Sequence, residues 1–194
     1  MNLLLGLLVG IGLSAACGFR VFVPLLIMSV ASISGNLELA ENFKWISTYT
    51  AFFGFLIATL LEVSGYYIPW VDNLLDTVAT PAAVVAGSIV TASCITEVSL
   101  FLQWSLAIIA GGTASGAVQL TTTSLRGASS ATTGGMGNHF VSTLEGIGST
   151  LIPIISILFP FFTILLVAMI SYIIFKKIIP KLISIKRKVF KQSS

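Results

Sequence analysis

The chain has 194 residues, of which 56% are hydrophobic and only 9% are charged, whereas soluble globular domains are about a quarter charged. This composition excludes an ordinary soluble domain and predicts a protein whose solvent is the hydrocarbon core of a bilayer. The formal net charge of +3 is unevenly distributed, because seven of the ten basic residues follow residue 175. We interpret residues 176–194 as a cytoplasmic tail that contacts anionic lipid headgroups, and we expect no nucleic-acid binding.

Six segments are apolar enough to span or enter the bilayer, for which a helix needs about 20 residues. The fifth segment is the weakest candidate for a span, because it contains several glycines as well as Asn138, His139 and Glu145. On hydropathy alone it would be a loop, and the chain would have five spans. The distribution of positive charge favours six, since both termini and Arg126 then lie inside and only Lys44 lies outside. The six segments are 2–33, 48–67, 77–95, 100–125, 130–151 and 154–175.

The second half of the sequence resembles the first. A glycine-rich stretch at 12–18 recurs in character at 111–117, and a Leu-Glu pair followed by Ile-Pro occurs at 61–69 and again at 144–153. Three segments in each half would invert the second copy relative to the first, as in small inverted-repeat transporters. The sequence therefore predicts an all-α polytopic helical bundle with one transmembrane domain, residues 1–175, built from repeats at about 1–97 and 98–175.

The first and fourth segments are not expected to be uniform helices. The pairs Gly6/Gly10 and Gly112/Gly116 have the small-xxx-small spacing that lets helices approach closely. Pro24 has no backbone N–H and is expected to kink or break the first segment. Two interpretations remain open, close helix packing alone or a broken helix that lines a substrate path.

Four ionisable residues lie at membrane depth, where each costs about 2.5 to 3.5 kcal/mol on insertion scales unless it is paired or lines a cavity. In the six-span topology Arg20 lies towards the outside and Glu62 towards the inside. We therefore expect Arg20 to pair with Glu145 near the outer surface, and Glu62 to pair with Arg126 near the inner surface. An Arg20–Glu62 pair is an alternative, and structural salt bridges that fix helix register would explain the same residues.

Other polar residues are expected to line the same pathway. They are Ser14, Thr113, Asn138 and His139. His139 is the only histidine and can either relay protons near neutral pH or form an interhelical hydrogen bond. The cysteines, Cys17 and Cys94, have no metal-ligand spacing, and the sequence has no catalytic constellation, so we expect no enzyme active site, metal or cofactor.

Asp72 and Asp76 are spaced so that both carboxylates lie on one face of a helix. Such a face at the membrane surface suits Mg²⁺ and a phosphorylated substrate, as in lipid-modifying transferases. The favoured interpretation is simpler: Asp76 precedes the third segment and complements the positive end of its helix dipole.

Two motifs resemble those of a known family. The chain is similar to the bacterial domain of unknown function 4126 family at residues 18–26 (GFRVFVPLL) and 68–76 (IPWVDNLLD), and more loosely at 123–126 and 137–140. The resemblance covers about residues 4–172 and implies a small multi-pass protein of the bacterial inner membrane. Relatives commonly have an acid–lysine pair where this chain has Tyr66-Tyr67, so the role of those charges does not carry over.

The favoured function is a transporter or channel for a small solute or ion, with a central polar pathway between the repeats. One alternative is a non-transporting accessory or scaffold subunit of a larger membrane complex, since close-packing glycines suit that function equally well. A minor alternative is a Mg²⁺-dependent lipid-phosphate enzyme. The expected partners are the bilayer and either a second copy of the chain or a membrane-complex partner.

Overall fold

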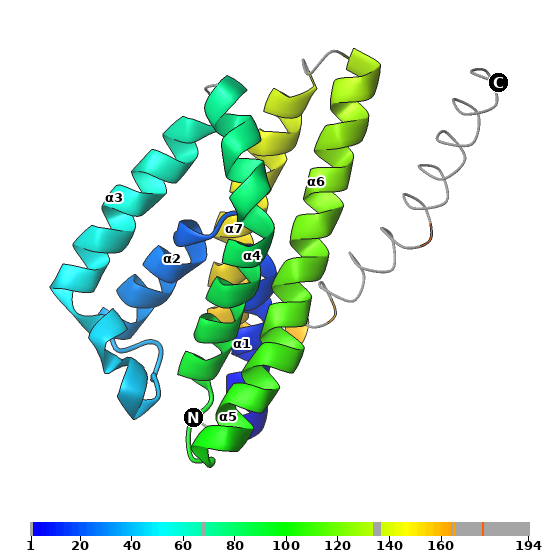
Figure 1. Cartoon of the computed structure of the whole chain (residues 1–194). Helices are drawn as coiled ribbons and strands as arrows, with labels where there is room; N and C mark the ends of the chain where they lie inside the picture. Colours follow the sequence, from blue (N-terminus) through cyan, green and yellow to red (C-terminus); the bar gives the residue numbers. More distant parts are fainter. Residues whose placement is uncertain (1, 67–68, 134–136, 164, 166–175, 177–194) are drawn as a thin grey trace.

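The computed structural model describes residues 2–66, 69–133, 137–163, 165 and 176, except for the side chains of 69–77, 128, 131–133 and 139. The elements in these ranges are all helical (Figure 1). In chain order they are α1 (Leu3–Cys17), α2 (Phe22–Ile33), the 3₁₀ helix η1 (Glu41–Ser47), α3 (Tyr49–Gly65), α4 (Pro69–Cys94), α5 (Leu100–Leu106), the π-helix η2 (Ala107–Gly112), α6 (Thr113–Thr133) and α7 (Asn138–Leu158).

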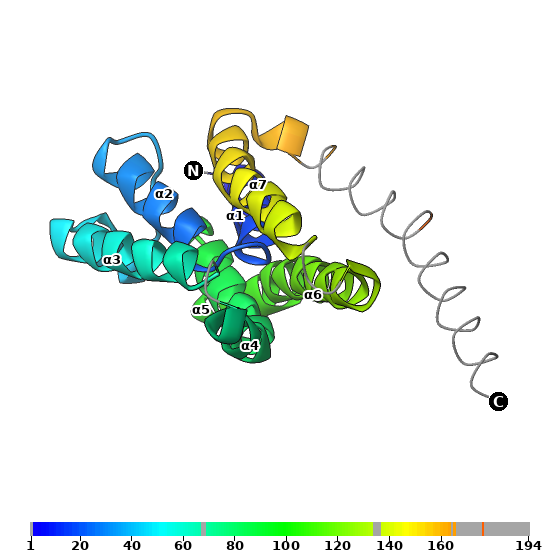
Figure 2. The same cartoon turned by 90° about the horizontal axis from the view of Figure 1, so that it is seen from above.

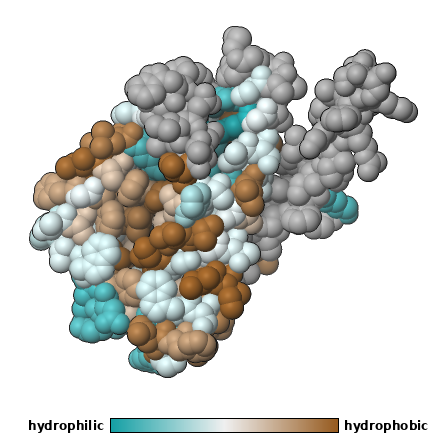
Figure 3. Space-filling view, in the orientation of Figure 1, coloured by the Kyte–Doolittle hydropathy of each residue, from teal (hydrophilic) through white to brown (hydrophobic). Residues whose placement is uncertain are grey.

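The surface of the described helices is apolar, as expected for helices that face lipid. Phe101 is 83% exposed, and Leu61 and Ile109 are each 69% exposed. Apolar side chains cover much of the face in Figure 3. Among the described residues, Leu100–Gly127 and Phe140–Leu158 are long and apolar enough to cross a membrane, and η1 with α3 adds a third span if this bent pair is counted as one. This is the architecture of a helical membrane protein.

Helix α1 lies at the centre of the bundle, where it contacts α2, α4, η2, α6 and α7 (Figure 2). Gly6 faces the carbonyl of Cys94, and Gly10, further along α1, faces Thr91, which is earlier in α4. The two helices are therefore antiparallel. A Cβ on Gly6 would overlap the Cys94 carbonyl oxygen, so only glycine permits this approach. The predicted close packing at Gly6/Gly10 is therefore an interface within the chain.

The first predicted segment, 2–33, folds back on itself as a hairpin of α1 and α2. The start of α1 lies beside Cys94, and the second half of α2 lies at the same end of α4, where the Ser93 hydroxyl donates a hydrogen bond to the Met28 sulfur at 3.3 Å. Figure 1 shows the two arms running in opposite directions. The 15 residues of α1 extend only about 22 Å, less than the roughly 30 Å hydrocarbon core. The interpretation of this segment as a single crossing is wrong.

The turn of this hairpin lies at residues 18–21. Gly18 ends α1 against Ser115 and Val118 of α6, where a Cβ would overlap the Ser115 carbonyl oxygen. Pro24 is the third residue of α2. N–H groups in the first turn of a helix have no intrahelical acceptor, so the missing N–H of proline costs no hydrogen bond there. The chain therefore breaks before Pro24, which lies within the first turn of the new helix.

Later helix boundaries also differ from those predicted. Helix α6 continues to Thr133, and α7 occupies Asn138–Leu158, so the fifth segment is shifted from the predicted 130–151. The third segment begins earlier, at Pro69, in the first position of α4 where proline is well accommodated. Half of the predicted sixth segment, 154–175, and nearly all of the tail 176–194 lie outside the described residues. The predicted start of the sixth segment at residue 154 is wrong, because α7 continues without a break to Leu158.

Candidate functional site

Four buried ionisable residues from four parts of the fold lie close together, and the two arginines among them contact one aromatic ring. Arg20 lies at the hairpin turn, Glu62 on α3, Arg126 on α6 and Glu145 on α7, and none is more than 8% exposed. Tyr66, the C-cap of α3, is 8% exposed, and its ring centroid lies 3.8 Å from Cζ of Arg20 and 4.4 Å from Cζ of Arg126. We call these five residues the charged cluster.

Arg126 and Glu145 form a buried ion pair within the charged cluster. The Arg126 Nε donates to Glu145 Oε1 at 3.1 Å, and its Nη2 bonds Glu145 Oε2 and the Ser142 hydroxyl. Arg126 lies seven residues before Thr133, the end of α6, and Glu145 lies seven residues after Asn138, the start of α7. Equal distances from the ends of two consecutive antiparallel helices place the two side chains at one level. The predicted Glu62–Arg126 and Arg20–Glu145 pairs are therefore wrong.

Glu62 caps the N-terminus of α2. Its Oε1 accepts a hydrogen bond from the Val21 N–H at 2.7 Å, and its Oε2 accepts one from the Phe22 N–H at 3.0 Å. A carboxylate satisfies these otherwise orphaned donors and complements the helix dipole. Glu62 is thus level with the hairpin turn rather than at the opposite membrane surface from Arg20.

The Arg20 side chain has few direct partners. Its Nη2 donates to the Ser142 carbonyl at 3.3 Å, whereas its Nε and Nη1 are buried with no hydrogen-bond partner. In the described part of the chain Arg20 forms no ion pair with Glu62, the alternative weighed from the sequence, although the two charges are close enough to interact electrostatically.

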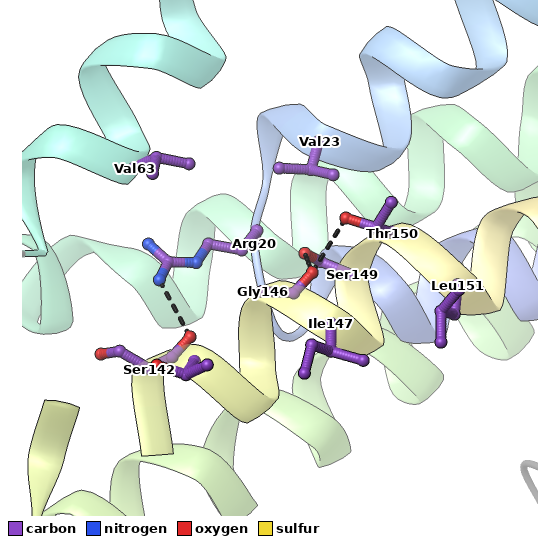
Figure 4. Close-up of a pocket in the computed structure, with 10 residues that line it drawn as sticks. Arg20, Val23, Val63, Ser142, Gly146, Ile147, Ser149, Thr150 and Leu151 are labelled. Carbon is purple, nitrogen blue, oxygen red and sulfur yellow. Dashed lines mark hydrogen bonds between the residues drawn. The ribbon is translucent and has the colours of Figure 1, made fainter. Parts of the chain in front are cut away.

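Arg20 faces a cavity of about 430 Å³ between the start of α2, the end of α3 and one face of α7. Figure 4 shows its guanidinium between Val63 of α3 and Ser142 of α7. The other residues that line this cavity are Val23, Thr143, Gly146, Ile147, Ser149, Thr150 and Leu151.

A second cavity, of about 380 Å³, lies on the α4 side of the charged cluster. Glu62 and Tyr66 line it together with Phe19 at the hairpin turn and Gln119 of α6. Each cavity is therefore lined by part of the charged cluster: Arg20 faces the first, and Glu62 and Tyr66 face the second.

Three of the other predicted pathway residues, Ser14, Thr113 and Asn138, do not join the charged cluster. The fully buried Ser14 hydroxyl donates to the Gly111 carbonyl at 2.5 Å and attaches α1 to the π-helix η2. Thr113 is exposed at the start of α6, and Asn138 Nδ2 donates to the Ser130 hydroxyl at 3.0 Å between the ends of α6 and α7. The side chain of His139 lies outside the described residues.

Asp72 and Asp76 fall within α4, whose first residue is Pro69. The interpretation of Asp76 as a residue at the helix start is wrong, because the helix begins seven residues before it. The side chains of both aspartates lie outside the described residues, so the magnesium hypothesis stays a prediction. Among the described residues, no group of histidine, cysteine and acidic side chains is placed to hold a metal ion.

Sequence reasoning missed two members of this site, Tyr66 and Ser142. Both lie one helical turn from a predicted glutamate. Tyr66 comes four residues after Glu62, and Ser142 comes three residues before Glu145. Residues three and four apart share a helix face, so this spacing was the available signal.

Comparison with known proteins agrees with the motifs at 18–26 and 68–76. The model of a family described as a domain of unknown function, DUF4126, matches residues 7–178. Neither the curated proteins nor the solved structures contain a match to this chain. Since the matched region covers most of the sequence, the chain belongs to the DUF4126 family.

Proposed function

We propose that this protein is a membrane transporter or channel for a small solute or ion, and that the charged cluster is its central polar element. The observation that carries the proposal is the convergence of two arginines and two glutamates at a helix break, with members of the cluster facing two cavities. Ionisable residues are expensive among apolar helices and typically mark substrate or ion pathways. Interrupted helices that end at membrane depth are a common way to build such sites.

Each half of the chain contributes one arginine and one glutamate to the charged cluster. Arg20 and Glu62 come from the first half, and Arg126 and Glu145 come from the second. This supports the proposed relation between the halves, although the hairpin in the first half has no counterpart in α5–α6. A repeat relation between the halves remains part of the proposal, with the first of the six segments entering as a hairpin instead of crossing once.

The proposed location is the bacterial inner membrane, with the C-terminus on the cytoplasmic side. The support is the run of basic residues in 176–194, which suits the positive-inside rule and anionic headgroups.

The accessory-subunit alternative loses one of its supports. Gly6 and Gly10 pack on α4, and Gly112 and Gly116 also face α4 through Ser88 and Val84. These small-residue faces are therefore covered within the chain rather than left for another protein.

Flux through reconstituted vesicles tests the proposal. Vesicles that contain the protein are given gradients of protons, chloride or phosphate, each with an enclosed dye that responds to that ion, and leakage above protein-free vesicles is measured. Glu62→Gln and Glu145→Gln should each lower this flux towards that of protein-free vesicles, because each removes a charge from the cluster. Glu97→Gln, at an exposed glutamate outside the cluster, is the matched control and should leave flux unchanged. Equal flux in all three variants would contradict the proposal.

A further inference from the structure

Arg20 is a buried guanidinium whose hydrogen-bond donors are only partly satisfied. It is 3% exposed, and the donors on Nε and Nη1 have no hydrogen-bond partner. A buried polar group without a partner costs about 1 to 3 kcal/mol, and more when it is charged. A guanidinium kept in this state calls for an acceptor that the described side chains do not supply.

The neighbours of Arg20 offset its positive charge but accept no hydrogen bond from its Nε or Nη1. The Tyr66 ring covers the face of the guanidinium, a cation–π contact that leaves the N–H groups in the guanidinium plane unsatisfied. Glu62 uses one oxygen on the Val21 N–H and the other on the Phe22 N–H. Glu145 is bound by Arg126. The carboxylates of the charged cluster are thus already engaged elsewhere.

The cavity beside Arg20 has one charged donor and largely apolar walls. Val23, Val63, Ile147 and Leu151 line it together with hydroxyl-bearing residues of α7. Two of those hydroxyls, on Ser149 and Thr150, donate to the Gly146 carbonyl and have no proton left for an anion. Its volume, about 430 Å³, lies in the range of small-molecule sites and is much larger than a bare inorganic anion needs.

We propose that Arg20 binds the oxyanion group of an amphiphilic ligand, a carboxylate or phosphate carried on an apolar body that lies along Val23, Val63, Ile147 and Leu151. Arginine N–H groups and anionic oxygens form short, strong hydrogen bonds, and the apolar walls exclude water from them. The ligand is either a free amphiphile or an anionic lipid. This inference names the substrate class at the proposed transport site and rests on that proposal only for its biological purpose.

Gly146 offers a way to close the cavity without touching the charges. It lines the cavity, and a Cβ built on it meets nothing within 4 Å. Gly146→Leu therefore fills part of the cavity and replaces a helical glycine with a strong helix former. Gly54→Leu, at another open helical glycine on α3, is the matched control outside the cavity.

The test measures thermal unfolding of the purified protein in a neutral maltoside detergent. Octanoate and octyl phosphate should raise the midpoint of the wild-type protein and of Gly54→Leu, whereas inorganic phosphate and uncharged octyl glucoside should not. Gly146→Leu and Arg20→Gln should lose the shift, and the unliganded midpoint of Gly146→Leu should be no lower than that of the wild-type protein. Equal shifts with octyl glucoside, or undiminished shifts in Gly146→Leu, would overturn the inference. A shift with inorganic phosphate but not with octanoate or octyl phosphate would show that the ligand needs no apolar body. If no anion shifts the midpoint, water alone fills the cavity and the inference is wrong.

Two further measurements separate the ligand source and the two proposals. Native mass spectrometry is performed on protein released from nanodiscs that contain phosphatidylglycerol or only phosphatidylcholine. If the wild-type protein retains phosphatidylglycerol and Gly146→Leu does not, the ligand is an anionic lipid. If the protein binds the anions but vesicles show no flux, the inference about Arg20 holds and the transport proposal is wrong. If flux falls in Glu62→Gln but no anion binds, the transport proposal holds and the inference about Arg20 is wrong.

Discussion

At the scale of single residues, the charged cluster consists of charges that are individually costly and mutually dependent. Arg126 and Glu145 are each under 5% exposed and satisfy one another directly. A buried pair of this kind adds little net stability compared with an apolar pair of the same size, yet the loss of one partner leaves an uncompensated charge. The positions of such charges could be predicted from the sequence, because an ionisable residue in an apolar run is conspicuous. Their partners could not, since pairing depends on where helices end.

Arg126→Leu should lower the free energy of unfolding by about 3 to 5 kcal/mol, because Glu145 stays buried without a partner. The double variant Arg126→Leu/Glu145→Leu should recover much of this loss. Unfolding in mixed micelles, followed by circular dichroism, measures both. The surface pair Lys44–Glu41, with N–O distance 2.6 Å and side chains 62% and 82% exposed, is the control, and Lys44→Leu should change stability little. A double variant as unstable as the single one would refute this interpretation.

At the scale of elements, the helices are positioned by small residues as much as by large ones. The π-helical turn η2 lies against α1 and α4, and Gly111 within it approaches Thr91 more closely than any larger residue allows. A π-turn commonly marks a place where a helix adapts to a neighbour, and here the Gly111 carbonyl accepts the Ser14 hydroxyl. The glycine spacing predicted close approach correctly in the first and fourth segments. It could not tell which helix would be approached.

Gly6→Ala should destabilise the protein by about 1 to 3 kcal/mol, because the new methyl group overlaps the Cys94 carbonyl and the backbone of α1 must move. Gly54→Ala adds the same methyl group to α3 in open space and should stabilise the protein by up to about 1 kcal/mol. Thermal unfolding of the two variants in one detergent provides the comparison. Similar midpoints would show that α1 and α4 are not in close contact.

At the scale of the whole molecule, the hairpin decides the direction of every later helix. The largely apolar stretch of 32 residues from Asn2 to Ile33 is long enough for one crossing, and equally for two short arms of 15 and 12 residues. With two arms, α3 runs in the same direction as α1, and Glu62 on it reaches the level of the turn (Figure 1). Hydropathy is the same in both cases, so this choice was invisible in the sequence.

The hairpin predicts that the residues before α1 and after α2 face the same side of the membrane. Single cysteines placed by Asn2→Cys and Asn36→Cys should react with an impermeant maleimide from one side, and Ser130→Cys near the end of α6 should react from the other. The native Cys17 and Cys94 are fully buried and should provide an unlabelled background. Labelling of Asn2→Cys and Asn36→Cys from opposite sides would restore a single crossing.

By itself, the sequence determined the solvent, the helical class, the family motifs and four of the five residues in the charged cluster, because composition and isolated charges are local properties. Only the tertiary structure decided that Glu62 caps α2, that Arg126 binds Glu145, and that the Tyr66 ring contacts two guanidinium groups. Those contacts depend on the depth of each side chain in the bundle. Depth follows from where the chain reverses, at residues 18–21 and between Thr133 and Asn138, and a reversal between apolar arms leaves little trace in hydropathy.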